Sequence, residues 1–163
     1  MVTWILVLVM MAGLFLLLLA AVGFVQDKRF FTSAPQEIRD AVLPKPERFR
    51  GQHLFGYCLA AFAALLMVGA IVFGAWDGIR HGFRFGQFFL RFLVMFWGQK
   101  LFDIAFFDWY LLCRSNFFPH FFPEVKGVVG PHLFGYNWKS HCAEMTVHLA
   151  VSTVLAWVCT AFF

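Results

Sequence analysis

The feature that most constrains this chain is its long apolar stretches, because each is long enough to cross a lipid bilayer as a helix. A bilayer core about 30 Å thick is crossed by about 20 apolar helical residues. Only 13% of the residues are charged and 61% are hydrophobic, whereas about 25% of an average water-soluble domain is charged. We therefore predict an all-α polytopic membrane protein, built as one four-helix transmembrane domain over residues 1–163, with spans at 3–25, 54–76, 88–113 and 144–163.

Basic residues are unevenly distributed between the predicted loops. The loop between the second and third spans holds only Arg80 and Arg84, while loops 26–53 and 114–143 hold Lys28, Arg29, Arg39, Lys45, Arg48, Arg50, Arg114, Lys126 and Lys139. Because cytoplasmic loops retain Lys and Arg, this pattern predicts cytoplasmic long loops and both termini outside. With no recognisable targeting peptide, it fits a bacterial plasma (inner) membrane. Topology accounts for the net charge of +4, so we expect no nucleic-acid partner.

The first long loop contains the signals of a short cytoplasmic helix. Ser33 is a suitable N-cap, and Pro35 and Glu37 suit a first helical turn. The prolines Pro44 and Pro46 would end the helix.

A short internal repeat follows each long loop. GQHLFGY at Gly51–Tyr57 and GPHLFGY at Gly130–Tyr136 are identical at six of seven positions. This echo predicts two helix pairs in parallel, an arrangement that often builds a site at the interface of the pairs. Chance in a Phe- and Gly-rich chain is the alternative. The repeat pairs His53 with His132 and Tyr57 with Tyr136.

The third predicted span carries charges that are costly inside a bilayer. Lys100 and Asp103 are three residues apart, so they share a helical face and can neutralise each other. This pair is as compatible with a structural role as with a functional one. In an α-helix Asp108 is about 100 to 140° around from that pair and needs its own partner. Arg91 is near enough to the outer end to reach the headgroups.

The fourth predicted span begins with a stripe of His141, Glu144 and His148, which share one helical face. The stripe could supply metal ligands, although it matches neither the HExxH motif nor the Glu-x-x-His motif of di-iron proteins. Interfacial or packing polar groups are the alternative interpretation. The predicted topology collects the polar groups of several helices in the cytoplasmic half of the bundle. The candidate binding residues are Lys100, Asp103, Asp108, Glu144, Tyr57 and Tyr136, and the candidate metal ligands are His53, His132, His141 and His148.

Three functional hypotheses are open, of which the first two use this cluster. The first is binding or transport of an ion or small solute, with Asp103, Asp108 and Glu144 as carboxylates. The second is a membrane enzyme or electron carrier with a metal, or with a haem held by His53 and either His141 or His148. The third is an accessory subunit of a larger membrane complex. The cofactor is left open between none, a metal and a haem.

Small residues at four-residue spacing predict close helix packing. They indicate a homo-oligomer or a partner membrane protein in addition to the lipid bilayer. Packing within one bundle is the alternative. The small residues are Gly56, Ala60 and Ala64 in the second span and Ser152, Ala156 and Thr160 in the fourth.

The segment LFDIAFFDWYLLCRSNFFP, residues 101–119, carries two aspartates, a DW pair and a following cysteine. It resembles small bacterial four-helix membrane proteins of uncharacterised function. The resemblance covers the end of the third span and part of the next loop. It implies a four-helix membrane fold and no activity, and it assigns no site residue.

Overall fold

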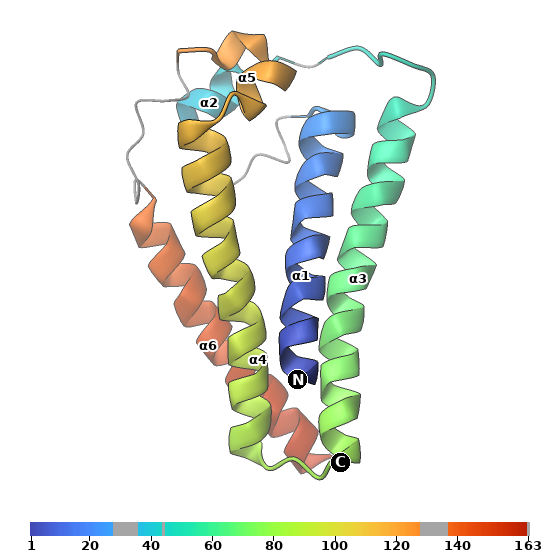
Figure 1. Ribbon diagram of the computed structural model, residues 1–163, viewed down its shortest axis with the longest axis vertical. Helices are drawn as coiled ribbons and strands as arrows, with labels where there is room; N and C mark the ends of the chain where they lie inside the picture. The colour runs from blue at the N-terminus through green and yellow to red at the C-terminus, as the bar shows by residue number, and fades with distance from the viewer. Residues whose placement is uncertain (28–35, 44, 128–136, 163) are drawn as a thin grey trace. The chain divides into compact units, whose positions relative to one another are not determined.

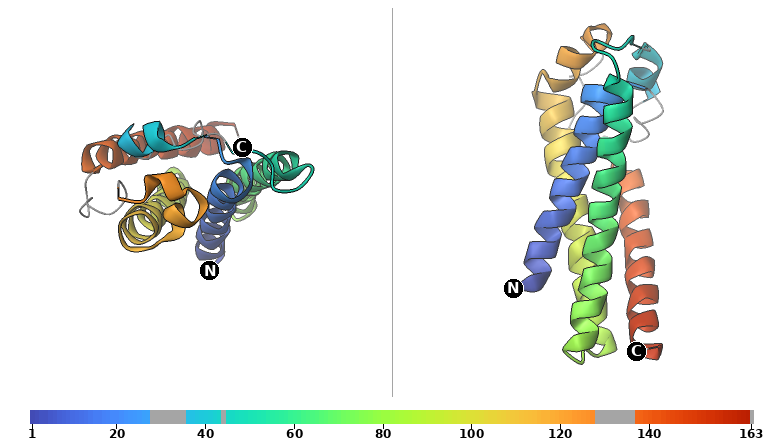
Figure 2. Two further views of the ribbon diagram at one scale, coloured as in Figure 1. Left: turned by 90° about the horizontal axis from the view of Figure 1, so that it is seen from above. Right: turned by 90° about the vertical axis from the view of Figure 1, so that its right-hand side faces the viewer.

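The computed structural model describes residues 1–27, 36–43, 45–127 and 137–162 of the chain, and within these ranges all regular structure is helical, with no strand (Figures 1 and 2). The elements are α1 (Val2–Leu19), the π-helix η1 (Ala20–Val25), α2 (Gln36–Ala41), α3 (Gln52–Arg80), α4 (Phe85–Phe102), the π-helix η3 (Asp103–Arg114), α5 (Phe117–Phe121), the 3₁₀-helix η4 (Pro123–Val125) and α6 (Trp138–Ala161).

Three helical segments of the described chain are long and apolar enough to cross a membrane, namely Val2–Val25, Gln52–Arg80 and Trp138–Ala161. The all-α prediction is confirmed. The predicted third span, 88–113, does lie in helix from Phe85 to Arg114, but it is not among these apolar segments. Its charges are the physical reason, so the structure shows three such helices and not clearly four.

The observed element bounds extend the predicted ones. α3 continues to Arg80, four residues past the predicted end, and α6 begins at Trp138, six residues before the predicted start. In the first long loop, α2 covers 36–41. Ser33, Pro35 and Pro44, which we expected to bound that helix, lie outside the described residues.

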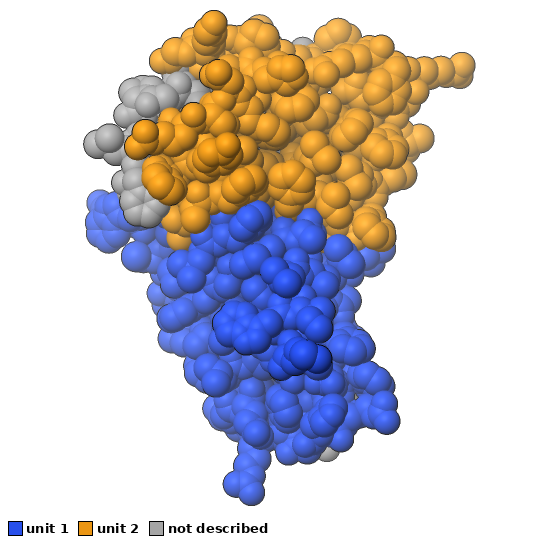
Figure 3. Space-filling view, viewed as in Figure 1, with its two compact units in different colours: residues 1–14, 65–103, 137–163 blue, residues 15–64, 104–136 orange. Residues whose placement is uncertain are grey.

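The chain divides into two compact units, coloured separately in Figure 3. Unit 1 comprises residues 1–14, 65–103 and 137–163, and so takes its helices from α1, α3, α4 and α6. Its core is apolar and draws on all four helices, because each has an apolar stripe to bury. The buried core residues are Leu6, Val7, Met10, Ala70, Phe88, Phe92, Met95, Phe96, Ala156 and Cys159.

The turn between α3 and α4 is set by two glycines. Gly82 has a φ of +63°, and the N–H of Phe83 donates to the carbonyl of Gly78 while the N–H of Gly82 donates to that of Ile79. This is the Schellman arrangement, which requires a left-handed residue after the helix. A Cβ on Gly78 would lie 2.4 Å from the ring of Phe88. The two glycines therefore allow α3 to end sharply and α4 to pack closely against it.

Unit 2 comprises residues 15–64 and 104–136. Its short helices bury one apolar side chain or more each, among them Ile38 of α2, Phe118 of α5 and Val125 of η4. α3 and η1 approach closely, because a Cβ on Gly56 would lie 2.7 Å from Cγ2 of Val25. In this unit the small residue Gly56 packs within the chain.

The sides of α3 that are not packed are apolar. Only 17% of the most apolar 18-residue stretch of α3 is buried. Its large exposed side chains include Leu65, Val68, Val72 and Phe73. Contiguous exposed apolar surface of this kind is costly in water and normal against lipid.

Candidate functional site

The candidate site lies in unit 1, where α4 packs along α6. Lys100 is in the last turn of α4, Asp103 is its C-cap, and Glu144 is in the second turn of α6. The indole N–H of Trp97 donates to the backbone carbonyl of Met145 at 3.3 Å. This bond ties the two helices together within one turn of the charged residues.

Lys100 contacts two carboxylates. Its Nζ lies 2.7 Å from Oδ2 of Asp103 and 2.5 Å from Oε2 of Glu144. The Lys100 side chain is 5% exposed, against 17% for Asp103 and 45% for Glu144. Ser140 donates to the other carboxylate oxygen of Glu144 at 3.2 Å. The Lys100–Asp103 pair predicted from spacing is present, and Glu144 adds a second negative charge to it.

We call this set of Lys100, Asp103 and Glu144 the lysine cluster. With ordinary protonation it carries two negative charges and one positive charge. Charge-assisted hydrogen bonds of this length are strong, but one ammonium cannot neutralise two carboxylates. The lysine cluster therefore has a formal charge of −1, in a site from which water is largely excluded around Lys100.

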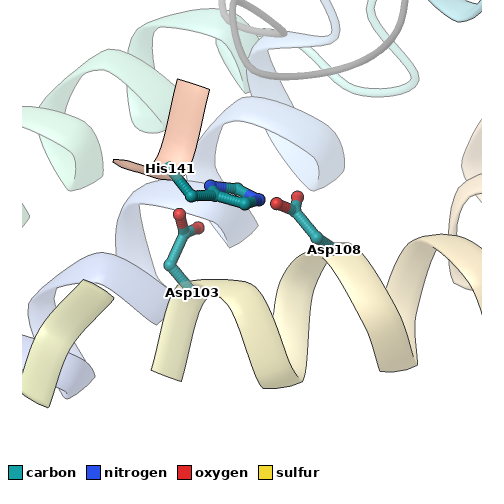
Figure 4. Close-up of side chains that lie close together, drawn as sticks. All are labelled: Asp103, Asp108 and His141. Carbon is teal, nitrogen blue, oxygen red and sulfur yellow. The ribbon is translucent and has the colours of Figure 1, made fainter. Parts of the chain in front are cut away.

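Two histidines of α6 border the lysine cluster. His141 is buried, and one of its ring nitrogens lies within 4.8 Å of a carboxylate oxygen of Asp103 (Figure 4). His148 stacks on Phe96 of α4, with ring centroids 5.4 Å apart and an interplanar angle of 23°. In the part of the chain that the structure describes, Nδ1 of His148 is buried and has no hydrogen-bond partner. Neutral imidazoles so placed can accept a proton or bind a metal.

A second buried ion pair in unit 1 escaped the sequence analysis. Arg91 was expected to reach the headgroups, but its side chain is only 5% exposed, and it donates to Oδ2 of Asp77 at 2.7 Å and to the Gly74 carbonyl at 2.8 Å. Its guanidinium also lies over the ring of Phe83, 4.3 Å from the centroid. Asp77 fell beyond the predicted end of the second span, so its partnership with Arg91 was not considered.

The remaining predicted site residues belong to unit 2 or lie outside the described residues. Asp108, His53 and Tyr57 belong to unit 2, and Tyr57 is 50% exposed. His132 and Tyr136 lie outside the described residues, as does the rest of the second repeat copy. The repeat relation, and a haem held by His53 with His141 or His148, therefore stay predictions.

The expected angular position of Asp108 was wrong because it assumed an α-helix. Residues 103–114 form a π-helix, whose hydrogen bonds join residues five apart. Asp103 and Asp108 are five residues apart, so they project from the same side of this helix (Figure 4).

In unit 2, His53 is associated with a carboxylate at the start of α3. Glu47 accepts hydrogen bonds from the backbone N–H groups of His53 at 3.0 Å and of Gly51 at 3.1 Å. These two bonds lower the pKa of the Glu47 carboxyl, because they favour its charged form. Glu47 thus caps the N-terminal end of α3, and its contact with the His53 ring is longer, at 3.7 Å.

Comparison with known proteins finds no match: no family model, no curated protein and no solved structure is similar to the chain. The resemblance of residues 101–119 to small bacterial four-helix membrane proteins accordingly stays untested.

Proposed function

We propose that this chain is an integral membrane protein that binds a small cation, a proton or a metal ion, at the lysine cluster. The observation that carries the proposal is that a single buried ammonium is shared by two carboxylates. Charged groups within membrane helices cost about 2.5 to 3.5 kcal/mol each on insertion scales, and those that persist are commonly functional.

The net negative charge of the lysine cluster favours the binding of a cation. A proton or a monovalent cation bound at Asp103 or Glu144 would bring the lysine cluster to neutrality, which is the least costly state in a medium of low dielectric, whereas a divalent ion would leave a charge of +1. Lys100 competes with that cation for the same carboxylate oxygens, since it already contacts both. Binding would therefore be an exchange, in which the ammonium is displaced from one carboxylate and kept by the other.

The histidines favour two identities for the cation. A proton could reside on His141, one of whose ring nitrogens lies within 4.8 Å of a carboxylate oxygen of Asp103, or on His148, four residues after Glu144 in α6. A divalent transition metal could use the oxygen of Asp103 and the ring nitrogen of His141, which are within 4.8 Å of each other. The haem hypothesis needs His53 of unit 2 as one of its two ligands, and it stays a prediction.

A cation titration of the purified protein in detergent would test the proposal. We expect saturable binding of Na⁺, K⁺, Mg²⁺ or Zn²⁺ by calorimetry, or uptake of about one proton as the pH is lowered. The variant Glu144→Gln should abolish either signal by removing the surplus charge. The control is the double variant Arg91→Met with Asp77→Leu, which deletes the other buried ion pair and should bind as the unaltered protein does.

Two results would contradict the proposal. One is the absence of both cation binding and proton uptake in the folded protein. The other is unchanged binding in Glu144→Gln. Either result would leave an accessory subunit in a membrane complex as the better hypothesis.

We also propose an orientation in a bacterial inner membrane, with the α3–α4 turn on the outer side and with both termini outside. The support is the uneven distribution of Lys and Arg between the loops. Single cysteines at His81 and Ser140, in a background without the native cysteines, would test it. An impermeant thiol reagent added outside should label only the His81→Cys variant. Labelling of the Ser140→Cys variant alone would show that the opposite orientation is correct.

A further inference from the structure

A cavity in unit 1, remote in sequence from the lysine cluster, lies at the α3–α4 turn and the C-terminal end of α6. Its volume is about 370 Å³, within the range of about 300 to 1,000 Å³ that is usual for small-molecule sites. Three phenylalanines and an isoleucine supply its apolar walls. The lining residues that matter here are Phe83, Arg84, Phe85, Phe88, Cys159 and Thr160.

The charge around this cavity is positive. Arg84 lines it, and none of the ion pairs among the described residues involves Arg84. Phe85, also in the lining, is the first residue of α4, and a helix N-terminus carries partial positive charge. The acidic residue nearest in sequence, Asp77, is already bound to Arg91. The cavity therefore combines an uncommitted guanidinium with aromatic walls.

The position of the cavity suits a membrane boundary. It lies where α3, long and apolar enough to cross a membrane, turns into α4, and beside the last turn of α6, a second such helix. The ends of membrane-crossing helices lie at the depth of the lipid headgroups. There an amphipathic ligand can place its charged group in the polar region and its chain in the apolar one.

We infer that this cavity binds a membrane phospholipid of net negative charge, with the phosphate at Arg84 and the upper part of an acyl chain against Phe83 and Phe88. Arg is well suited to phosphate because its planar fork donates two parallel hydrogen bonds. Arg84 and the partial positive charge at the start of α4 favour an anionic headgroup over a zwitterionic one. This inference rests on the membrane location in the proposed function and is independent of the cation site.

The test is a lipid titration of the purified protein in detergent, with phosphatidylglycerol compared with phosphatidylcholine and an apparent Kd taken from the rise in melting temperature. Phosphatidylglycerol should bind more tightly than phosphatidylcholine. Arg84→Gln should weaken phosphatidylglycerol binding by about tenfold or more, the loss expected for a hydrogen bond to a charged group. Arg80→Gln is the matched control, because the guanidinium of Arg80 lies over Trp76, 4.9 Å from the ring centroid, and does not line the cavity.

A second pair of variants tests whether the lipid occupies the cavity. Thr160→Phe should fill part of the cavity and weaken phosphatidylglycerol binding, whereas Thr153→Phe, at an exposed position of α6 away from the cavity, should not. Inorganic phosphate alone should give no comparable stabilisation.

Four outcomes would overturn the inference. They are equal binding of both lipids, an equal effect of the Arg84 and Arg80 variants, an equal effect of the two Phe variants, and stabilisation by free phosphate alone. The cation titration at the lysine cluster is read separately in the same preparations, so failure of one proposal can be told from failure of the other.

Discussion

Two buried ionic clusters on the same helix differ in their charge balance. Arg91 and Lys100 are nine residues apart on α4, about 14 Å along the axis. Arg91 meets one carboxylate, that of Asp77, and gives another hydrogen bond to a backbone carbonyl. Lys100 meets two carboxylates. The first cluster is neutral and the second is not.

The difference shows which buried ionic cluster is already neutral and which one still carries a net charge. The Arg91–Asp77 pair fixes α3 against α4, and a guanidinium with its rigid fork suits a permanent contact. A lysine ammonium is a compact charge on a flexible stem and can transfer from one oxygen to another. The balanced pair is therefore interpreted as structural, and the unbalanced one as the site that exchanges a cation.

The largest expected effect is on stability, from Lys100→Met. This change leaves two carboxylates near each other without a cation, and we expect it to lower the free energy of unfolding by about 5 kcal/mol, the upper end for a broken buried pair. Denaturant unfolding in detergent would measure the loss. A loss below that of Glu144→Gln would show that Lys100 does not hold the two carboxylates together.

The next effect is from Arg91→Met, for which we expect a loss of about 3 kcal/mol. It is smaller because Asp77 keeps a second neighbour, with Nδ1 of His81 at 3.4 Å from its Oδ1. Adding Asp77→Leu to this variant should restore much of the stability, since no buried charge then remains unpaired. Additive losses in the double variant would mean that the two side chains do not stabilise each other.

A smaller effect is expected from Glu144→Gln, about 1 kcal/mol, the usual net contribution of one hydrogen bond. Lys100 keeps Asp103 in this variant, so the remaining pair is balanced as Arg91–Asp77 is. By contrast, Lys100→Met combined with Asp103→Leu still leaves Glu144 without its cation and should not fully recover. Full recovery in that double variant would place Glu144 outside the lysine cluster.

The smallest effect is expected for an ion pair outside the apolar helices. Lys45 and Glu124 of unit 2 meet at 3.2 Å with about a fifth of each side chain exposed. Glu124→Gln should cost about 0.2 to 1 kcal/mol at pH 7, as exposed pairs do. The Lys45–Glu124 pair thus serves as a reference for the two buried clusters, because desolvation contributes little to its stability.

The Lys45–Glu124 pair also predicts a pH dependence. Burial opposes the charged form of Glu124, but hydrogen bonds from its own backbone, from Lys45 and from Leu43 outweigh burial and lower its pKa from 4.5. A lowered carboxyl pKa stabilises the fold above the unfolded value, and that stabilisation is lost as the pH falls through the folded value. The stability difference between the unaltered protein and Glu124→Gln should thus persist at pH 6 and shrink below pH 4.5. A constant difference down to pH 3 would contradict it.

The apolar helices and the Lys100–Asp103 pair were predictable because both follow from spacing along one helix. The contact of Lys100 with Glu144 was harder to predict, since it depends on how α4 packs on α6. The Arg91–Asp77 pair was missed because the hydropathy pattern ended the second span at Trp76, one residue before Asp77. The position of Asp108 was mistaken because nothing in its local sequence distinguishes a π-helix from an α-helix. Residue spacing along the sequence therefore does not predict how two helices pack or where a helix departs from the α-helical repeat.

The π-helical run from Asp103 to Arg114 has a consequence for how this protein can change over generations. Removing one residue from an α-helix rotates everything beyond it by about 100° and so turns a buried face outward. In η3 the wider repeat already holds more residues per turn, so a one-residue deletion can be absorbed by a return to the α-helical repeat. This end of the helix should therefore tolerate the loss of a single residue, while the α4 segment bearing Arg91 and Lys100 keeps its register.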